Sequence, residues 1–326
     1  MSSFTSHAID AVLPLVANDL PRFRILFLSL DRFYRARGTL WVVVPDRQLQ
    51  EIRAQLVALC GDALESEDAP PSASSASNKS WIRLLAETTV VPELTAFPWL
   101  KGWYRQQLVK LAIADVVETE FYITLDADVV ATRPIEYASL IIDGRSVCRV
   151  YALDLHPDWY QSSRKVLGLT PKRSGISHNV TPALLHRDAV RALAKHLEAR
   201  ATESRNLFAS WSSRLRGALA AFSNLAEHDR SSWRWYLASH APWTEYALYY
   251  TFLEATDQFD HWHIDSTQGL YDRELCVWRD SAANFEHWDP ATSFGGEGLP
   301  SFVVIQSIAK LDPERIWNKV APFIEG

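Results

Sequence analysis

The chain has 326 residues, of which 48% are hydrophobic, and its formal net charge at pH 7 is -6. This length and hydrophobic content suffice for a large buried core. The negative charge argues against nucleic acid as the main partner, because phosphate backbones bind to basic surfaces. The three cysteines lie far apart and form no CxxC pair, so neither a zinc site nor a disulfide framework is indicated.

The sequence shows no targeting signal and no transmembrane segment. No uncharged apolar run of about 18 residues occurs, as a membrane span would need. The first residues, MSSFTSHAID, lack the basic-then-apolar order of a secretion signal. We therefore expect a cytoplasmic protein. Contact with the inner face of the membrane stays open, because residues 200–240 are rich in aromatic side chains.

The amino-terminal part alternates between strand and helix patterns. Residues 8–17 and 40–44 are apolar runs typical of buried strands, and helical patterns follow each of them, over residues 21–34 and 47–59. This alternation predicts a Rossmann-like α/β fold, with a mostly parallel sheet flanked by helices. Ligands of such sheets bind beyond the carboxyl ends of the strands, which places residues 16–19 near a ligand. The absence of GxGxxG and Walker A motifs argues against dehydrogenases and P-loop kinases.

Two acids follow the next predicted strand. Residues 100–117 have helical periodicity, and residues 121–125 (FYITL) are β-formers that predict a short buried strand. Asp126, Ala127 and Asp128 come directly after it. Residues two apart on an extended backbone point the same way, so both carboxylates can face one cation such as Mn²⁺ or Mg²⁺. The alternative is that the two acids only cap a turn.

The carboxyl-terminal half contains two further candidate positions. His178 and Asn179 precede an apolar run at residues 183–185, which predicts a strand that returns to the site. Thr244 and Glu245 have the pattern of a helix start, in which the acid is favoured by the helix dipole. Between them, residues 187–240 are predicted to be helical and irregular.

The run GWYRQQLVKLAIADVVETEFYITLDADVV resembles the metal-binding segment of GT-A-type glycosyltransferases. It is also similar to a bacterial family of uncharacterised glycosyltransferase-like proteins found near polysaccharide genes. The resemblance is strongest over residues 99–134, weaker at the amino end and over residues 243–254, and covers about half of the chain with any specificity.

The resemblance implies one GT-A-like domain over residues 1–326. Residues 1–150 would form the half that binds the nucleotide-sugar donor. Residues 151–326 would form the acceptor half, with a helical acceptor-side insertion at about residues 187–240.

The resemblance further implies a metal-dependent glycosyltransferase. It would move a sugar from a nucleotide-sugar, foremost a UDP-sugar, to a hydroxyl of a saccharide or glycolipid acceptor in bacterial surface polysaccharide or glycoconjugate synthesis. Asp126 and Asp128 would hold Mn²⁺ or Mg²⁺. The implied donor-binding residues are Val16, Asn18, Asp19, Arg105, Lys110, Asp126, Ala127 and Asp128. The implied acceptor-binding residues are His178, Asn179 and Trp243.

The stereochemistry and the class of the protein leave alternatives open. In an inverting reaction a carboxylate takes the proton of the acceptor hydroxyl, and the resemblance of the WTEY segment makes Glu245 the catalytic candidate, with Asp265 and Asp289 in reserve. A retaining reaction needs no such base. A nucleotidyltransferase is a second class, but the Gly-rich loop that usually marks it is absent from residues 17–24. A non-catalytic interaction protein is a third.

Overall fold

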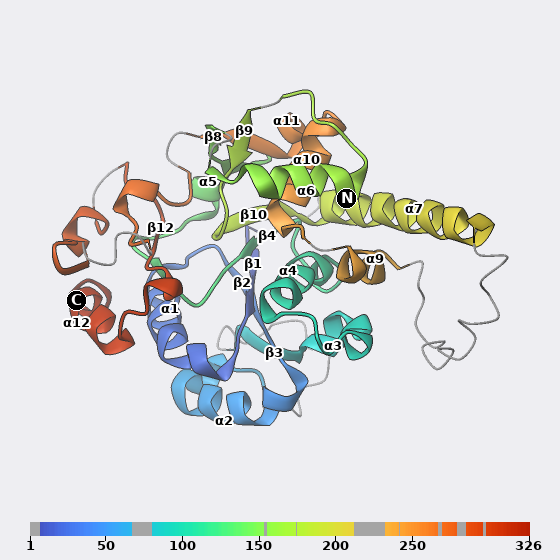
Figure 1. The fold of residues 1–326 in the computed structure, drawn as a ribbon. Coiled ribbons are helices and arrows are strands. Elements are labelled where there is room, and N and C mark those ends of the chain that lie inside the picture. The colour runs from blue at the N-terminus through green and yellow to red at the C-terminus, as the bar shows by residue number, and fades with distance from the viewer. Residues whose placement is uncertain are drawn as a thin grey trace, which may run out of the picture.

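The computed structural model describes residues 7–66, 80–152, 155–173, 175–211, 232–240, 242–266, 269–278, 285–295 and 298–326. Its centre is a five-stranded sheet with the strand order β10-β4-β1-β2-β3 (Figure 1). The parallel strands are β1 (Ile9–Pro14), β2 (Arg37–Val44), β3 (Ile82–Ala86) and β4 (Phe121–Thr124). At one edge β10 (Ala183–His186) runs antiparallel to β4. The predicted α/β fold with a mostly parallel sheet is confirmed.

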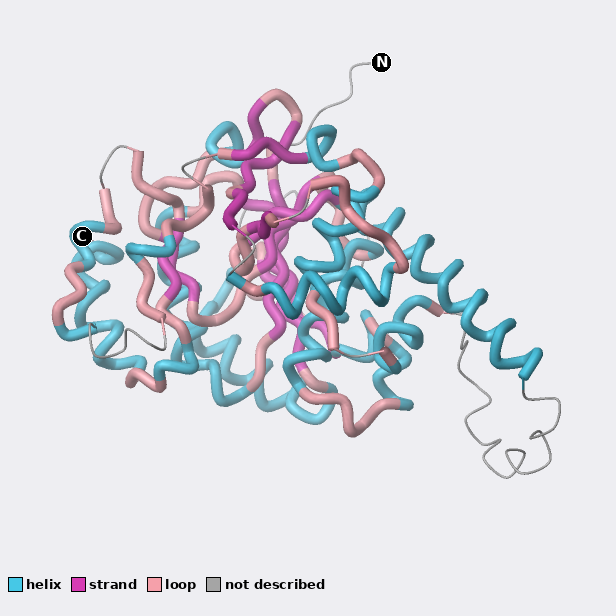
Figure 2. Tube along the Cα trace, turned by 45° about the horizontal axis from the view of Figure 1, so that its top comes forward, coloured by secondary structure: helices cyan, strands magenta, loops and turns pink. Residues whose placement is uncertain are grey.

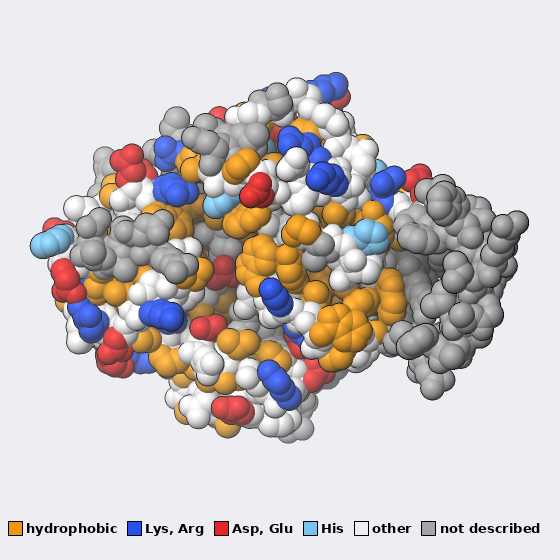
Figure 3. Space-filling model, viewed as in Figure 1, with side chains coloured by type: hydrophobic (Ala, Val, Ile, Leu, Met, Phe, Trp, Pro, Cys, Tyr) orange, Lys and Arg blue, Asp and Glu red, His pale blue; other side chains and the backbone are white. Residues whose placement is uncertain are grey.

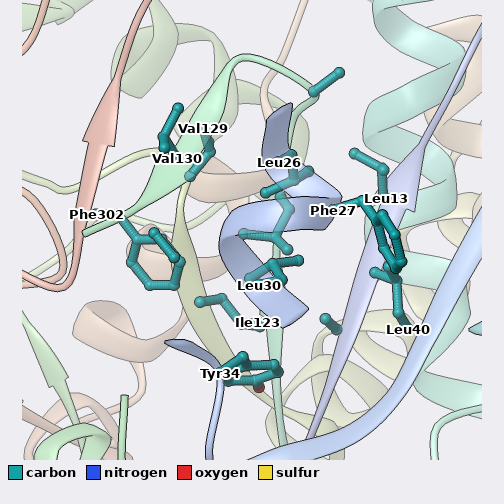
Figure 4. Packing of buried hydrophobic residues seen from close by; sticks show 14 of the residues in the cluster. Leu13, Leu26, Phe27, Leu30, Tyr34, Leu40, Ile123, Val129, Val130 and Phe302 are labelled. Atoms are coloured by element: carbon teal, nitrogen blue, oxygen red, sulfur yellow. The ribbon is translucent and has the colours of Figure 1, made fainter. Parts of the chain in front are cut away.

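The alternation of side chains along the strands builds a hydrophobic layer on each face of this sheet. Ala11 and Leu13 belong to one layer and Val12, between them, belongs to the other, as the period of two in a strand requires. Helices α1 (Leu20–Phe33), α2 (Leu49–Cys60) and α12 (Pro313–Glu325) contribute to the first layer. Leu26 and Leu30 of α1 belong to the same layer as Ile123 of β4, and Figure 4 shows Leu30 near Ile123. The sheet is therefore buried on both sides.

The second layer is formed with helices from the middle of the chain. They are α4 (Gly102–Ala112), α7 (Arg187–Trp211), α9 (Trp233–Ser239) and α10 (Glu245–Ala255). Both α7 and α9 fall within the helical insertion predicted at about residues 187–240, and its residues 212–231 lie outside the described residues. In Figure 2 the end of α7 projects from the body of the protein. Among the described residues, no helix has the length and apolarity needed to cross a bilayer.

Within the described residues, three smaller sheets accompany the central one. The first pairs β5 (Val129–Ala131) with β12 (Phe302–Val304), and the second joins β6 (Ile141–Ile142), β7 (Arg145–Cys148) and β11 (His263–Asp265). The third pairs β8 (Val150–Ala152) with β9 (Ile176–His178). Further helices are α3 (Glu87–Val90), α5 (Tyr137–Leu140), α6 (Pro157–Leu167) and α11 (Phe259–Trp262). The β5–β12 pair brings the segment after β12 beside the two acids that follow β4.

The strand order creates a switch point between β1 and β4. From β1 the chain adds β2 and β3 on one side, and β4 then pairs with the other side of β1. In open α/β sheets a ligand binds in the crevice outside the carboxyl ends of the strands at such a point. Asp19, which follows β1, and Asp126, which follows β4, are placed there by topology alone.

Candidate active site

Two adjoining cavities lie at the carboxyl edge of the parallel strands. The first, which we call the acidic cleft, has a volume of about 300 Å³, and its charged lining residues are Asp19, Arg22, Lys110, Asp126, Asp128 and Glu245. The second, which we call the strand-end cavity, has a volume of about 560 Å³ and is lined partly by Leu15, Val43 and Arg105. Pro14 and Gln106 line both, so the two cavities adjoin at these residues. Figure 3 shows a hollow near the middle of this face, with acidic side chains inside it and hydrophobic side chains beside it.

Asp126 and Asp128 lie on the turn that joins β4 to β5. The Asp126 carboxylate is 38% exposed, and its Oδ1 lies 2.8 Å from the Lys110 ammonium. The Asp128 carboxylate accepts a hydrogen bond of 2.7 Å from the backbone N–H of Ser307, in the segment after β12. Within the described ranges, neither carboxylate accepts an N–H of its own turn. This geometry does not support the interpretation of the two acids as turn caps.

The charge on Asp128 is poorly compensated by the protein. Burial raises the pKa of its carboxyl to about 6, and the neighbouring charge of Asp126 acts in the same direction. The hydrogen bonds from Ser307 and the nearby guanidinium of Arg22 lower the pKa only in part. Burial also raises the pKa of Asp19, and Asp126 again adds to this effect. A cation bound between these acids would relieve the repulsion.

Lys110 links the acids to the opposite wall of the cleft. Its side chain, in the last turn of α4, is 4% exposed, and its ammonium lies 2.8 Å from Asp126 and 3.2 Å from Oε1 of Glu245. It also donates to the Thr181 hydroxyl at 3.1 Å. Burial by itself would lower the lysine pKa, but the carboxylate of Asp126, with Tyr246 and Glu245, raises it well above its usual value. Lys110 is therefore a permanent buried positive charge.

Glu245 is the first residue of α10, and two contacts hold it there. The Thr244 hydroxyl caps the helix by accepting from the backbone N–H of Ala247 at 3.1 Å. The amide oxygen of Gln107 accepts the backbone N–H of Glu245 at 3.1 Å. Burial raises the pKa of the Glu245 carboxyl, and Lys110 offsets part of that rise. A cleft carboxylate with a raised pKa is suited to receive a proton near neutral pH.

The predicted donor-binding residues divide between the two cavities. Asp19, Lys110, Asp126, Ala127 and Asp128 line the acidic cleft, whereas Val16 and Arg105 line the strand-end cavity. Arg105 is paired there with Glu87, and the distance between Nε and Oε2 is 3.1 Å. Asn18 is exposed and lines neither cavity. Lys110 and Arg105, both predicted to bind the donor, therefore face different parts of the site.

The predicted acceptor-binding residues do not reach the cleft. His178, Asn179 and Trp243 are only 3%, 2% and 1% exposed. Their side chains hydrogen-bond inside the protein, to partners that include Glu254, Pro182 and Leu237. The neighbouring residues Thr181 and Thr244 line the cleft instead. The burial of the three predicted side chains does not support a direct contact with an acceptor.

The two reserve acids also lie elsewhere. The carboxylate of Asp265 accepts the backbone N–H of Val150 at 3.1 Å, and that of Asp289 caps a short helix by accepting from Ala291 at 3.0 Å. Neither residue lines the acidic cleft. Of the three acids considered as a base, the cleft contains Glu245 alone.

Sequence reasoning missed several residues that line the cleft. Trp103 and Gln107 precede Lys110 at helical spacing, so the position of Lys110 could have indicated them. Arg22 and Trp159 come from distant segments, and no local pattern marks them.

The chain is thus an α/β protein with an acidic cleft at the switch point of its sheet. It belongs to the family described as "Family of unknown function (DUF6492)", which matches residues 6–326. No curated protein matches the chain.

Among solved structures, the chain is similar to a galactosyltransferase, LgtC, in complex with donor and acceptor sugar analogs. The identity is 10% and the TM-score 0.43, over 96% of each chain. The bifunctional glycosyltransferase WbbM has 13% identity and a TM-score of 0.35, over 60% of this chain and 35% of its own. GlyE of Streptococcus pneumoniae TIGR4 has 11% identity and a TM-score of 0.35, over 97% and 63%. Similarity at this level does not define an activity.

Proposed function

We propose that this chain is a metal-dependent glycosyltransferase of the GT-A type, which uses a nucleotide-sugar. The observation that carries the proposal is the convergence of Asp126, Asp128, Lys110 and Glu245 in one cleft at the switch point. The resemblance of residues 99–134 to GT-A glycosyltransferases supports the same conclusion. It also supports a UDP-sugar donor, a saccharide or glycolipid acceptor, and a role in surface polysaccharide or glycoconjugate synthesis at the cytoplasmic face of the membrane.

The strand-end cavity is suited to the nucleoside of the donor. It has the volume of a small-molecule site, with apolar walls that include Leu15 and Val109. Asp46 and Arg105 add polar groups that can orient a base or a ribose. Because Gln106 lines both cavities, a diphosphate bound near it would connect the nucleoside to a sugar in the acidic cleft.

The residues of the cleft fit a hard divalent cation that is shared with a diphosphate. Asp126 and Asp128 would hold Mn²⁺ or Mg²⁺, since both offer carboxylate oxygens and the charge of Asp128 lacks full compensation. No group of three or more His, Cys, Asp or Glu side chains suited to a metal occurs among the described residues. The donor diphosphate and water would therefore complete the coordination shell. The bound ion would stabilise the charge that develops on the leaving diphosphate.

In the proposed reaction the acceptor hydroxyl oxygen forms a bond to the anomeric carbon of the donor sugar. The bond from that carbon to the diphosphate oxygen breaks, and its electron pair leaves with the nucleoside diphosphate. In an inverting reaction the Glu245 carboxylate receives the proton of the hydroxyl. Lys110 holds the carboxylates of Glu245 and Asp126 at 3.2 and 2.8 Å, and so fixes the base relative to the metal ligands.

The other two classes have less support. Residues 17–24, which lack glycine, form the short turn Ala17–Asp19 and the start of α1 instead of a phosphate-binding loop. A nucleotidyltransferase usually carries such a loop at this position. An interaction protein has no need for the buried ammonium of Lys110 between two cleft acids.

Calorimetry with Mn²⁺ and a panel of UDP-, GDP- and CMP-sugars tests the proposed function. We expect at least one nucleotide-sugar to bind, and its affinity to rise strongly when Mn²⁺ is present. Absence of nucleotide binding both with and without the metal would exclude a glycosyltransferase.

Replacing Glu245 with Gln is expected to lower kcat of transfer by about a hundredfold or more, because general-base catalysis contributes roughly 10²–10⁴-fold. Donor affinity should change little, since the amide has the same shape. Transfer rates and calorimetric donor affinity, measured on the same preparation, give the comparison.

Glu254→Gln is the matched control, because Glu254 is equally buried but pairs with Arg173 and His178 outside the cleft. This variant should keep its kcat. If Glu245→Gln keeps its activity, Glu245 is not the general base, and a retaining reaction is favoured.

Binding of Mn²⁺ is expected to weaken as the pH falls through about 6, the value to which burial raises the pKa of Asp128. Below that pH the carboxyl holds a proton that must leave before the metal binds, so affinity should fall by up to about tenfold per pH unit. Titrations with Mn²⁺ at pH 5, 6 and 7 measure the slope. A constant affinity over this range would show that Asp128 is not a ligand.

A further inference from the structure

One face of α4 leads from the mouth of the acidic cleft to the acids inside it. Trp103, Gln106, Gln107 and Lys110 lie at positions i, i+3, i+4 and i+7, and all four line the cleft. At 1.5 Å per residue, the backbone positions of Trp103 and Lys110 are about 10 Å apart along the helix. The cleft thus changes along its length from an aromatic entrance to a charged interior.

The entrance presents aromatic rings from separate segments. Trp103 is 46% exposed, and its ring centre lies 6.0 Å from that of Trp159 on α6. The ring of Trp159 is stacked on His156 at 4.0 Å with an angle of 11° between the planes. Trp278 also lines the cleft, and its indole N–H donates a hydrogen bond of 2.8 Å to the Arg273 carbonyl. The planes of Trp159 and Trp278 are therefore held by protein contacts before any ligand binds.

A polar side chain lies between the entrance and the acids. The amide of Gln106 lines the cleft and has no hydrogen-bond partner in the part of the chain that the structure describes. A sugar matches this arrangement, since its C–H faces stack on aromatic rings and its hydroxyls bond to amides. An acyl chain would use the rings but leave the amide without a partner. The alternation of aromatic and amide groups thus favours a saccharide over a lipid tail.

We propose that Trp103 and Trp159 form the binding platform for a pyranose ring of the acceptor, an inference that rests on the proposed function. The reacting hydroxyl must reach Glu245, which lies beside Lys110 at the inner end of the α4 face. The backbone of Trp103, at the outer end, lies about 10 Å from that of Lys110 along the helix. That separation is the span of a disaccharide. The ring on the platform is therefore not the ring that reacts, and the acceptor contains at least two sugar units.

The test uses Trp103→Ala and Trp159→Ala in the full chain, with Trp99→Ala as the matched control. Trp99 is 72% exposed and lines neither cavity, so its removal controls for the loss of a surface tryptophan. Binding of wild type to a glycan array, with and without UDP and Mn²⁺, identifies the saccharide probe. Affinities for that probe and for its constituent monosaccharides are then measured by calorimetry and tryptophan fluorescence.

We expect wild type to bind di- or longer saccharides and not their monosaccharides. Each cleft variant should bind the saccharide roughly tenfold more weakly, as the removal of one stacking aromatic predicts. The acceptor KM should rise by roughly the same factor, while kcat changes little. Calorimetric affinity for the nucleotide-sugar should be unchanged, and Trp99→Ala should behave as wild type.

Three results would overturn the platform. One is equal saccharide binding by all three variants and wild type, and another is an array without any bound glycan. The third is binding to phosphatidylglycerol vesicles that depends on Trp103 while saccharide binding does not. Failure of the proposed function has a different signature, the absence of nucleotide binding, and saccharide binding measured without nucleotide still reports on the platform.

Discussion

Asp128→Asn is expected to lower the rate of sugar transfer by a factor of at least about a thousand. The same substitution is expected to make the metal-free protein more stable. The first effect follows because a neutral amide is a much poorer ligand for Mn²⁺ than a carboxylate, and such catalysis usually depends most on electrostatic stabilisation of the leaving group. The second effect follows because the negative charge of Asp128 destabilises the folded protein.

The sign of the stability effect comes from the pKa. Because the pKa of Asp128 in the folded state, about 6, lies above that of an unfolded aspartate, ionisation of this group opposes folding as the pH rises through that range. Asn carries no such charge, and its carbonyl oxygen can still accept the N–H of Ser307. At pH 7 we expect a gain on the order of 1–2 kcal/mol, after allowing for the partial exposure of the side chain.

Urea denaturation without metal and transfer assays with Mn²⁺ measure the two effects on the same protein. Asp265→Asn is the matched control, because Asp265 also accepts a backbone N–H but lies outside the cleft. It should leave transfer unchanged. If Asp128→Asn retains activity or destabilises the metal-free fold, the carboxylate has a structural role and the proposed metal site is wrong.

Lys110→Met is expected to cost about 3–5 kcal/mol of folding stability, because removing one partner of a buried ion pair leaves an uncompensated charge. The ammonium of Lys110 is 4% exposed and serves both Asp126 and the buried Glu245. Methionine fills a similar volume, so the expected loss comes from charge and hydrogen bonding and not from a cavity. Transfer should also be lost, since the metal ligand and the base are no longer held together.

The double variant Lys110→Met with Glu245→Gln separates charge compensation from packing. Neutralising Glu245 removes the buried charge that the single variant leaves unpaired, so part of the stability should return while transfer stays absent. Urea midpoints of the wild type, both single variants and the double variant complete the cycle. Equal stability of Lys110→Met and wild type would show that the ion pairs do not form in solution.

The fold was predictable because its signals are local. Apolar runs such as residues 40–44 alternate with helical patterns, and a parallel sheet is the common way to bury such strands on both faces. The placement of Asp126 and Asp128 was predictable for the same reason, since they follow a strand whose burial is evident from residues 121–125. Their roles as metal ligands stay predictions, as does the role of Glu245 as the base.

The acceptor side was less predictable. Trp243 and His178 have the composition of a sugar-binding site, yet both side chains are buried in the core. His178 ends strand β9, and Trp243 lies in the segment that leads into α10. Arg105 is similarly engaged by Glu87, a partner 18 residues away on a different element.

The amino-acid order was sufficient to define most strands of the central sheet, several of the helices that cover it and the two acids at its carboxyl edge, because hydrophobic periodicity and turn residues act over a few positions. Tertiary structure alone decided what surrounds those acids. Ser307 reaches Asp128 only through the pairing of β5 with β12, and Trp159 of α6 meets Trp103 of α4 only because the fold brings both to the same cleft. Contacts between segments more than 50 residues apart depend on how the layers pack, and that depends on the whole core at once.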